Sequence, residues 1–509
     1  MPLISHLKAQ EEETSNRIDY LKVIFKKMYS YFKFAKHTFL IGALHALGII
    51  QSLVFLPIIT KILGAGDYGI WVQIKATMGL LIPLGFFGLQ DSLIRFLSGE
   101  KNREKVQEGV YSSLALTSGA TLIMALILIV FSGPVAAFFQ FAPIFVKLLA
   151  LIIIFESLNS AFLTIIQTRR EIEKYFWFST LKIFGETGLI IGAITLGWGL
   201  YGAVFSLLFF RMAIFLVLSI YIIKKIGIKI PNFSLIRDYL RFGLPTMVNN
   251  LSYWVVASAD RYIIGFSLGI LFVGYYAPAY SIGMLLVFFI IPITSILTVA
   301  LPKFFDENNF DEVKNYLRHS LKYFLLIMTP AVFGMSILSR QLLEILSTKE
   351  IAANGYFVVP FIAASMFVYG IACFFNQILF LVKKTKLIAA IWGVAAFINL
   401  GLNVIFIPIF GIMAAAIITF ISYFCALLLI WYFAFKEIQF KIDWNFMIKS
   451  IVASTLMILF IWRFNPWGLF NVILSIILSV FIYGILIFLF RGVGKKEIKF
   501  LYEMAFSNK

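Results

Sequence analysis

Residues 63–81 read LGAGDYGIWVQIKATMGLL, and residues 268–286 read LGILFVGYYAPAYSIGMLL. When the two stretches are aligned from their first residues, two glycines and a pair of leucines coincide: Gly64 with Gly269, Gly69 with Gly274, and the leucines at 80–81 with those at 285–286. Repetition at a fixed period is typical of proteins built from duplicated units. The sequence therefore predicts a six-helix lobe that occurs twice, at 38–223 and at 242–435, with a linker at 224–241.

Apolar segments long enough to cross a lipid bilayer recur along the whole chain. Of its 509 residues, 61% are hydrophobic and 13% are charged, whereas soluble domains carry about 25% charged residues. Apolar runs of about 18 residues or more are typical of transmembrane helices. The predicted spans are 38–60, 70–94, 108–132, 143–166, 177–197, 200–223, 242–267, 270–300, 317–338, 356–382, 387–407, 411–435, 447–464 and 468–490. We therefore expect an all-α polytopic membrane protein with 14 transmembrane helices, two pseudo-symmetric six-helix lobes and two further helices within 436–490.

The basic residues are concentrated in alternate loops. The chain has 43 Lys and Arg residues, and most of them fall on the side of the membrane that holds the N-terminus. Loops rich in such residues face the cytoplasm, so both termini are predicted to be cytoplasmic, in a multi-pass protein of the cell membrane. The net charge of +18 then reflects topology, and no nucleic-acid binding is predicted.

The two ends of the chain are polar and basic. Within the N-terminal segment 1–37, residues 18–32 place apolar side chains at helical spacing between lysines. This pattern is typical of an amphipathic helix on an anionic membrane surface, and a disordered basic tail is the alternative. Residues 491–509 form a second cytoplasmic basic tail. Because both cysteines lie in apolar segments and the four histidines are dispersed, no disulfide, metal site or cofactor is predicted.

A few charged residues lie deep within the predicted spans. The basic ones are Lys75, Lys182, Arg211 and Arg261, and the acidic ones are Glu156, Glu186 and Asp260. A charge at the centre of a bilayer costs at least about 2.5–3.5 kcal/mol, so each of these residues requires a partner or a water-filled cavity. We therefore expect the basic residues to line a polar cavity within the membrane.

Several of these residues also have a purely structural interpretation. Lys182 and Glu186 are one helical turn apart and can pair within their own helix. Lys75 can extend its amine toward the membrane surface. Arg211 has no acidic residue one turn away, which favours a position facing the cavity.

Asp260 and Arg261 are neighbours in the seventh span. Successive side chains of a helix point about 100° apart, so the two side chains are not expected to face each other. We expect Arg261 to face the cavity, and Asp260 either to pair with another helix or to bind a coupling ion. The alternative is that both make structural bonds to neighbouring helices.

Motifs in three regions occur in an order that is characteristic of one family. They are LGAGDYGIW (63–71) followed by GLQDSLIRF (88–96), ADRYIIGFSLG (259–269) followed by VGYYAPAYSIG (273–283), and NLGLNVIFIPIFGIMAAAIIT (399–419). Together they resemble the polysaccharide-biosynthesis flippases, oligosaccharide-lipid exporters of the multidrug/oligosaccharidyl-lipid/polysaccharide superfamily. The resemblance implies two six-helix bundles in a V around a central cavity, with an acid–base pair in the seventh span. Fourteen spans are also found in the lipid II flippases, where the additional pair helps to form a lipid-facing groove.

The resemblance also implies a function. Such a flippase moves a polyprenyl-pyrophosphate-linked oligosaccharide from the cytoplasmic to the outer leaflet, for surface polysaccharide assembly, by alternating access of the two lobes. Arginine and lysine suit the pyrophosphate as a bidentate donor and a point charge. The predicted substrate-binding residues are Arg211, Arg261, Lys182 and Lys75. The coupling-ion candidates, for H⁺ or Na⁺, are Asp260, Glu156 and Glu186.

Other functions are weighed against this one. A multidrug/cation antiporter of the MATE type shares the fold, but its cargo favours an acidic cavity, and a lipid II flippase is a second alternative. Enzyme activity is not predicted, because the longest outer loop, at 339–355, is short and no paired-carboxylate constellation occurs. The absence of a Walker A pattern argues against direct use of ATP. The expected partners are the lipid-linked substrate, membrane lipids, and a glycan polymerase or glycosyltransferase.

Overall fold

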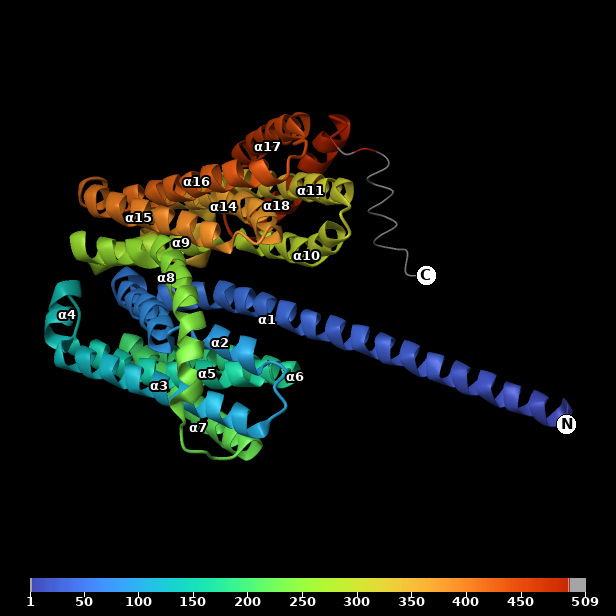
Figure 1. Cartoon of the computed structure of the whole chain (residues 1–509). Coiled ribbons are helices and arrows are strands. Elements are labelled where there is room, and N and C mark those ends of the chain that lie inside the picture. The colour runs from blue at the N-terminus through green and yellow to red at the C-terminus, as the bar shows by residue number, and fades with distance from the viewer. Residues whose placement is uncertain (1, 493, 495–509) are drawn as a thin grey trace.

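The computed structural model describes residues 2–492 and 494, and the side chains of all of these except 2–35 and 299. In this part of the chain, the regular secondary structure is α-helix with one 3₁₀ turn, η1 (Phe233–Leu235) (Figure 1). The helices are α1 (Pro2–Phe86), α2 (Leu89–Leu97), α3 (Arg103–Val130), α4 (Ser132–Phe139), α5 (Pro143–Thr168), α6 (Ile172–Thr195), α7 (Gly199–Ile226), α8 (Ile236–Ser267), α9 (Ile270–Met284), α10 (Val287–Asp306), α11 (Phe310–Ile337), α12 (Ser339–Leu346), α13 (Lys349–Gly355), α14 (Val358–Leu381), α15 (Thr385–Phe410), α16 (Ile412–Glu437), α17 (Trp444–Phe464) and α18 (Leu469–Leu489). The predicted amphipathic face at 18–32 and nearly all of the tail at 491–509 lie outside the described side chains.

Each predicted span falls mainly on helical backbone, but the helices divide the chain differently. Among the described residues, 11 helices are long and apolar enough to cross a membrane. The first predicted span lies within α1, the second covers the end of α1 and most of α2, and the eighth is split between α9 and α10. α6 and α8 fall outside the 11 helices. These two helices carry Lys182, Glu186, Asp260 and Arg261, and such charges lower the mean hydropathy of a segment.

Gly64 divides α1 into two helical segments. Its φ of 71° and ψ of −177° are non-helical, and the chain changes direction there. Gly269, which coincides with Gly64 in the sequence repeat, has φ 100° and ψ 162° just before α9. A side chain at either position would be strained in this conformation, so glycine is required at both. The two copies of the repeat therefore share a backbone feature as well as sequence.

The second pair of repeat glycines lies where the two copies pack on each other. A Cβ atom added to Gly69 would lie 2.2 Å from the carbonyl oxygen of Ile270. A Cβ atom added to Gly274 would lie 1.9 Å from the carbonyl oxygen of Ala65. Each glycine thus allows the backbone of the other copy to approach closely, and the contact is reciprocal.

Substitution of Gly69 by alanine is expected to destabilise this contact. The new methyl group meets the backbone, which cannot rotate away, so we expect a loss of about 1–3 kcal/mol in the free energy of unfolding. Gly66→Ala is the matched control, because nothing lies within 4 Å of its added Cβ. Thermal unfolding of the detergent-purified variants measures the difference. Equal melting temperatures for the two variants would contradict the close packing described here.

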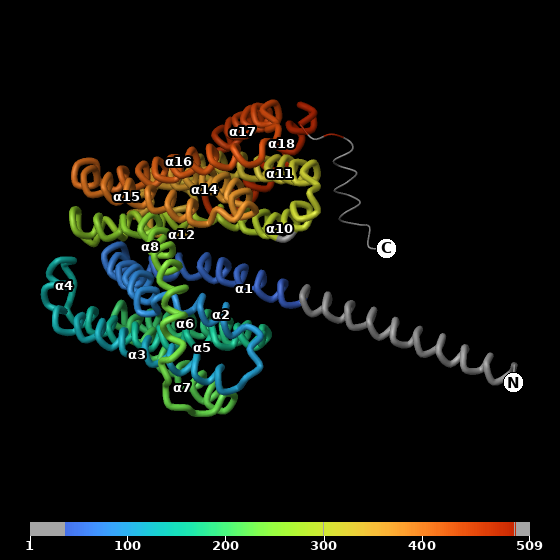
Figure 2. The backbone as a smooth tube through the Cα atoms, viewed as in Figure 1, coloured from blue at the N-terminus to red at the C-terminus, as the bar shows by residue number. Residues whose placement is uncertain are grey.

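The helices form two groups that follow the order of the chain. Helices α1–α7 pack largely on one another and form the N-terminal half, whereas α9–α18 form the C-terminal half (Figures 1 and 2). α8 runs between them and contacts α1 and α2 on one side and α15 on the other. α8 begins at Ile236, within the linker predicted at 224–241. The second segment of α1 also packs on α9, so the repeat lies at the junction of the halves.

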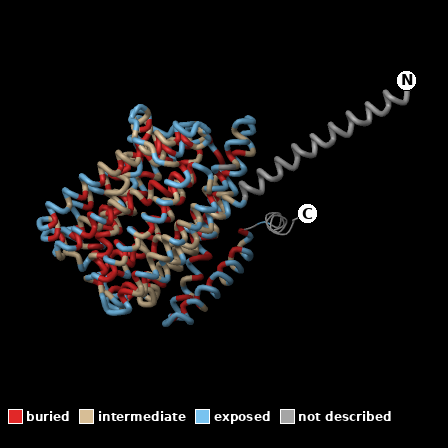
Figure 3. Tube along the Cα trace, turned by 90° about the horizontal axis from the view of Figure 1, so that it is seen from below, coloured by how far each residue is buried: buried red, intermediate tan, exposed pale blue. Residues whose placement is uncertain are grey.

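Burial is distributed as expected for a helical protein in lipid. A buried core joins the halves at the repeat, with Trp71 of α1 and Tyr276 of α9 among its members. A second core, which includes Phe324 and Tyr423, lies within the C-terminal half. Many residues along the outside of the helices are exposed (Figure 3), and large apolar residues are among them, such as Phe397, which is 79% exposed. Apolar surface of this extent is typical of contact with lipid.

Candidate functional site

A cavity of about 540 Å³ lies at the junction of the two halves. Its wall comes from α1, α6, α7, α8 and α9, with Leu285 just after α9 and Leu346 at the end of α12. The charged residues on this wall are Lys75, Lys182, Glu186, Arg211 and Arg261. The four basic residues predicted from the sequence therefore reach one cavity, although they are far apart along the chain.

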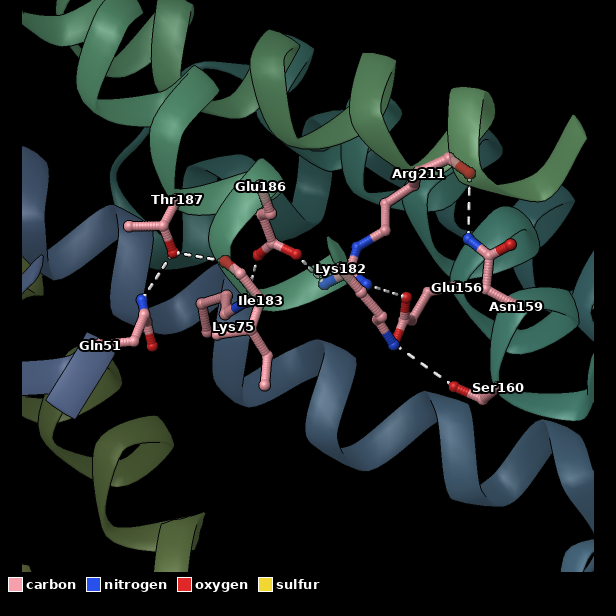
Figure 4. Close-up of polar contacts among 10 residues, drawn as sticks. All are labelled: Gln51, Lys75, Glu156, Asn159, Ser160, Lys182, Ile183, Glu186, Thr187 and Arg211. Atoms are coloured by element: carbon pink, nitrogen blue, oxygen red, sulfur yellow. Dashed lines mark hydrogen bonds and ion pairs between the residues drawn. The ribbon is translucent and has the colours of Figure 1, made fainter. Parts of the chain in front are cut away.

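Three of these basic residues belong to an ion-pair network in the N-terminal half (Figure 4). The carboxylate of Glu156 on α5 is 2.6 Å from Nζ of Lys182 and 2.5 Å from Nη1 of Arg211. The carboxylate of Glu186 on α6 pairs with Nη2 of Arg211 and lies 3.2 Å from Nζ of Lys75. Arg211 thus bridges the two carboxylates from α7, where its side chain is only 5% exposed.

The sequence left open whether Lys182 pairs with Glu186 and whether Lys75 faces the cavity, and the structure settles both points. Lys182 and Glu186 do not pair within α6: Lys182 pairs with Glu156, and Glu186 pairs with Lys75 and Arg211. Partners on other helices satisfy each charge and at the same time join α1, α5, α6 and α7. Lys75 turns toward the cavity, where its side chain is 40% exposed.

Neutral polar groups hold this network in place. Asn159 donates from Nδ2 to the carbonyl oxygen of Arg211 at 3.0 Å, and the hydroxyl of Ser160 donates to Glu156 at 3.3 Å. On the cavity wall, Gln51 donates from Nε2 to the hydroxyl of Thr187 at 2.7 Å. Sequence reasoning did not identify Gln51 or Thr187. The available signal was a pair of neutral polar residues within apolar segments.

Arg261 and Asp260 do pair, which corrects the expectation that they would not face each other. Nη1 of Arg261 is 3.1 Å from Oδ1 of Asp260 and also donates to the carbonyl oxygen of Ala257 at 2.7 Å. The arginine side chain is long enough to fold back over its neighbour, which the angle between successive Cβ atoms does not describe. Tyr276 on α9 donates its hydroxyl to Oδ2 of Asp260 at 2.5 Å, so Asp260 also pairs with another helix.

The guanidinium of Arg261 is held at the cavity wall from two sides. It lies 4.3 Å from the centroid of the Tyr280 ring, a cation–π contact, and Asp260 lies behind it with no exposed surface. The pair is electrically neutral. The network of the N-terminal half has three cations and two carboxylates, so the charged groups at the cavity have a net positive charge.

The described residues hold no group of three or more His, Cys, Asp or Glu side chains that could bind a metal ion. The arrangement is therefore a polar, positively charged chamber among apolar helices. Its chemistry is that of anion binding through a guanidinium and ammonium groups.

Solved structures with the same fold define the class of protein. The lipid II flippase MurJ, in an inward closed conformation, matches with a TM-score of 0.70 at 16% identity, covering 90% of this chain and 99% of MurJ. An inward-facing multidrug resistance MATE family transporter of the MOP superfamily matches with a TM-score of 0.60 at 16% identity, covering 78% and 94% of the two chains. With its many apolar helices, this chain is a multi-pass membrane protein with the MurJ and MATE fold.

The sequence itself places the chain within a family. A model of the polysaccharide biosynthesis protein family matches residues 58–352, and the chain belongs to that family. A curated relative from Haloferax volcanii, "Probable low-salt glycan biosynthesis flippase Agl15", is 22% identical over 450 residues. That match covers 88% of this chain and 92% of the relative.

Proposed function

We propose that this protein is a flippase for a polyprenyl-pyrophosphate-linked oligosaccharide, which it moves from the cytoplasmic to the outer leaflet for the assembly of a surface glycan. The observation that carries the proposal is the cavity wall, where four basic side chains and a single carboxylate lie among apolar helices. Charged side chains within a membrane are costly and mark the pathways of substrates or ions, so an excess of basic side chains favours an anionic cargo. The family and the relative named as a glycan biosynthesis flippase support the same function.

The cavity offers suitable groups for each polar part of this substrate. Arg211 and Arg261 can donate paired hydrogen bonds to phosphate oxygens, and Lys75 and Lys182 add point charges. The sugars would meet neutral donors and acceptors, namely Gln51, Ser52, Thr187, Ser258 and Ser281, and the aromatic rings of Tyr68 and Trp71. The polyprenyl tail is apolar and can remain in the lipid while the polar groups cross.

The transport cycle that we propose is alternating access between two six-helix lobes at 38–223 and 242–435. The chain would cross the membrane fourteen times, with both termini in the cytoplasm of a cell-membrane protein. The reciprocal contact of Gly69 and Gly274 and the packing of α1 on α9 support a pseudo-symmetric relation between the lobes. In transporters of this type, the substrate site lies near the middle of the membrane, between the repeats.

Coupling and partners form a further part of the proposal. Glu156, Glu186 and Asp260 are the candidates for binding H⁺ or Na⁺, and a glycosyltransferase or glycan polymerase is the expected partner. A lipid II flippase would require the same diphosphate chemistry. A MATE-type cation antiporter fits the cavity less well, because four basic side chains on the wall oppose a cationic cargo.

Reconstitution into liposomes tests this function directly. We expect the purified protein to move a fluorescent polyprenyl diphosphate oligosaccharide between leaflets, measured as the fraction of sugar that impermeant periodate oxidises. A matched glycolipid without the diphosphate should move at the rate of protein-free liposomes, because it lacks the anion that the basic residues bind. Transport of a cationic dye, with no movement of the diphosphate lipid, would overturn the proposal in favour of the antiporter.

A further inference from the structure

Glu186 is the only acidic residue among the described residues that line the cavity (Figure 4). Glu156, the other carboxylate of the network, lies behind the wall, where Lys182, Arg211 and the hydroxyl of Ser160 contact it. The two carboxylates therefore have different surroundings. Glu156 is positioned to hold Arg211 and Lys182 in place, whereas Glu186 occupies space that an anionic substrate can enter.

The contacts of Glu186 are those that a phosphate group would make. One of its oxygens pairs with Nη2 of Arg211, and the other accepts a hydrogen bond from Nζ of Lys75 at 3.2 Å. Carboxylate and phosphate oxygens use the same donors, so the two anions compete for them. The side chain of Lys75 is 40% exposed in the cavity. A phosphate can therefore replace Glu186 as its partner without disrupting the packed core. Glu186 is thus an internal anion that occupies the binding groups before the substrate arrives.

The net charge of the cavity shows what must accompany the exchange of the Glu186 carboxylate for a substrate diphosphate. The network has three cations and two carboxylates, and the Asp260–Arg261 pair adds no net charge. A diphosphate with a substituent at each end carries about two negative charges, which would leave the occupied cavity with a net negative charge. An uncompensated charge away from bulk water is costly, and a carboxyl group in that position binds a proton instead. One proton bound to a carboxylate makes the occupied cavity electrically neutral.

We propose that binding of the substrate diphosphate displaces the carboxylate of Glu186 from Arg211 and Lys75, and that Glu186 then takes up one proton. This inference rests on the proposed function and assigns the coupling ion within it. The proton comes from water, an O–H bond forms on the carboxylate, and no bond of the substrate breaks. Release of the substrate lets Glu186 pair again with Arg211 and Lys75, and the proton returns to water.

The groups around Glu186 identify it, and not a neighbour, as the proton acceptor. Lys75 and Tyr68 face the cavity from α1, Arg211 from α7, Arg261 from α8, and Lys182 from the same helix. From α5, Glu156 is the other candidate carboxylate, but it keeps Lys182 as a partner at 2.6 Å when a phosphate binds Arg211. The hydrogen bonds and ion pairs of Glu186 within the described residues are made only to the two cations that the phosphate would take.

Calorimetry of the full-length protein in detergent tests the proposal with a defined probe, a citronellyl diphosphate that carries one glucose. We expect wild type to take up about one proton per probe bound, measured in buffers of different ionisation enthalpy. Because one proton is taken up with each probe, its affinity should then fall by about tenfold for each unit by which the pH rises. Glu186→Gln should bind the probe with an affinity that hardly changes with pH, and at pH 8 it should bind more tightly than wild type. Glu437→Gln, which removes a carboxylate paired with Lys384 far from the cavity wall, should behave as wild type.

The outcomes separate this proposal from the proposed function. Binding by wild type without proton uptake overturns the role of Glu186 and leaves the flippase function standing. An unchanged pH dependence in Glu186→Gln assigns the proton to another group and likewise overturns it. If wild type does not bind the probe at any pH, the proposed function fails and this inference fails with it.

Discussion

Replacement of Arg211 by methionine is expected to abolish most of the transport of a diphosphate-linked oligosaccharide. Arg211 is the group that contacts both carboxylates, and its loss leaves two cations with two carboxylates, so the positive excess at the wall disappears. Removing one partner of a desolvated charge interaction typically costs about 2–5 kcal/mol of binding, which corresponds to about 30-fold to several-thousand-fold in affinity. The liposome assay with the fluorescent diphosphate oligosaccharide measures the loss.

The companion variants distinguish charge from packing. Arg211→Lys retains the charge but not the planar fork, so transport between that of wild type and that of Arg211→Met is expected. Stability should change less than transport in Arg211→Met, because Glu156 keeps Lys182 and Glu186 keeps Lys75. Wild-type transport by Arg211→Met, with normal amounts of folded protein in the membrane, would exclude Arg211 from substrate binding.

Replacement of Arg261 by glutamine is expected to have its largest effect on stability. Asp260 has no exposed surface, and without Arg261 its carboxylate keeps only the Tyr276 hydroxyl and a backbone N–H as donors. Leaving one member of a buried ion pair without its partner costs about 3–5 kcal/mol. We therefore expect a large drop in melting temperature and in the yield of folded protein, measured by thermal unfolding and by size-exclusion chromatography in detergent.

A double variant separates this structural cost from a role in transport. In Asp260→Asn/Arg261→Gln both charges are gone, so most of the stability should return, while transport of the diphosphate substrate should stay low. If the double variant is stable and transports as wild type does, Arg261 serves only the fold. If it remains as unstable as Arg261→Gln alone, the cost does not come from an uncompensated carboxylate.

The positions of the charged residues could be predicted from sequence because charge within an apolar segment is costly. The basic residues that this cost singles out are Lys75, Lys182, Arg211 and Arg261, and all four lie on one cavity wall. The partners of these residues could not be predicted, because helical spacing describes neighbours within one helix only. Lys182 has Glu186 one turn away and nevertheless pairs with Glu156 on α5.

For the fold as well, local sequence patterns could be recognised, whereas contacts between distant segments could not be predicted. The repeat of glycines was visible in the sequence, but the reason for Gly69 and Gly274 is a backbone crossing that only the packed structure contains. Asp260 and Arg261 were assigned to separate surroundings because Cβ directions were considered without the length of arginine. Gln51 and Thr187 were missed because neutral polar residues are common at contacts between membrane helices and carry little signal.

The location of the cavity ion pairs affects the energy barrier for movement of the two halves against each other. Every pair of the Lys75–Glu186–Arg211–Glu156–Lys182 chain joins helices of the N-terminal half, and the Asp260–Arg261–Tyr276 contacts join α8 to α9. When α1–α7 tilt as a rigid body against α8–α18, none of these ionic contacts has to break. The activation barrier for such a movement would then come from sliding apolar surfaces and from hydrogen bonds between the halves, such as those from Tyr262 to Thr77 and from Lys61 to the carbonyl oxygen of Ile345. A headgroup bound to Arg211 and Lys75 would move with the N-terminal half, while the ion pairs of that half stay intact.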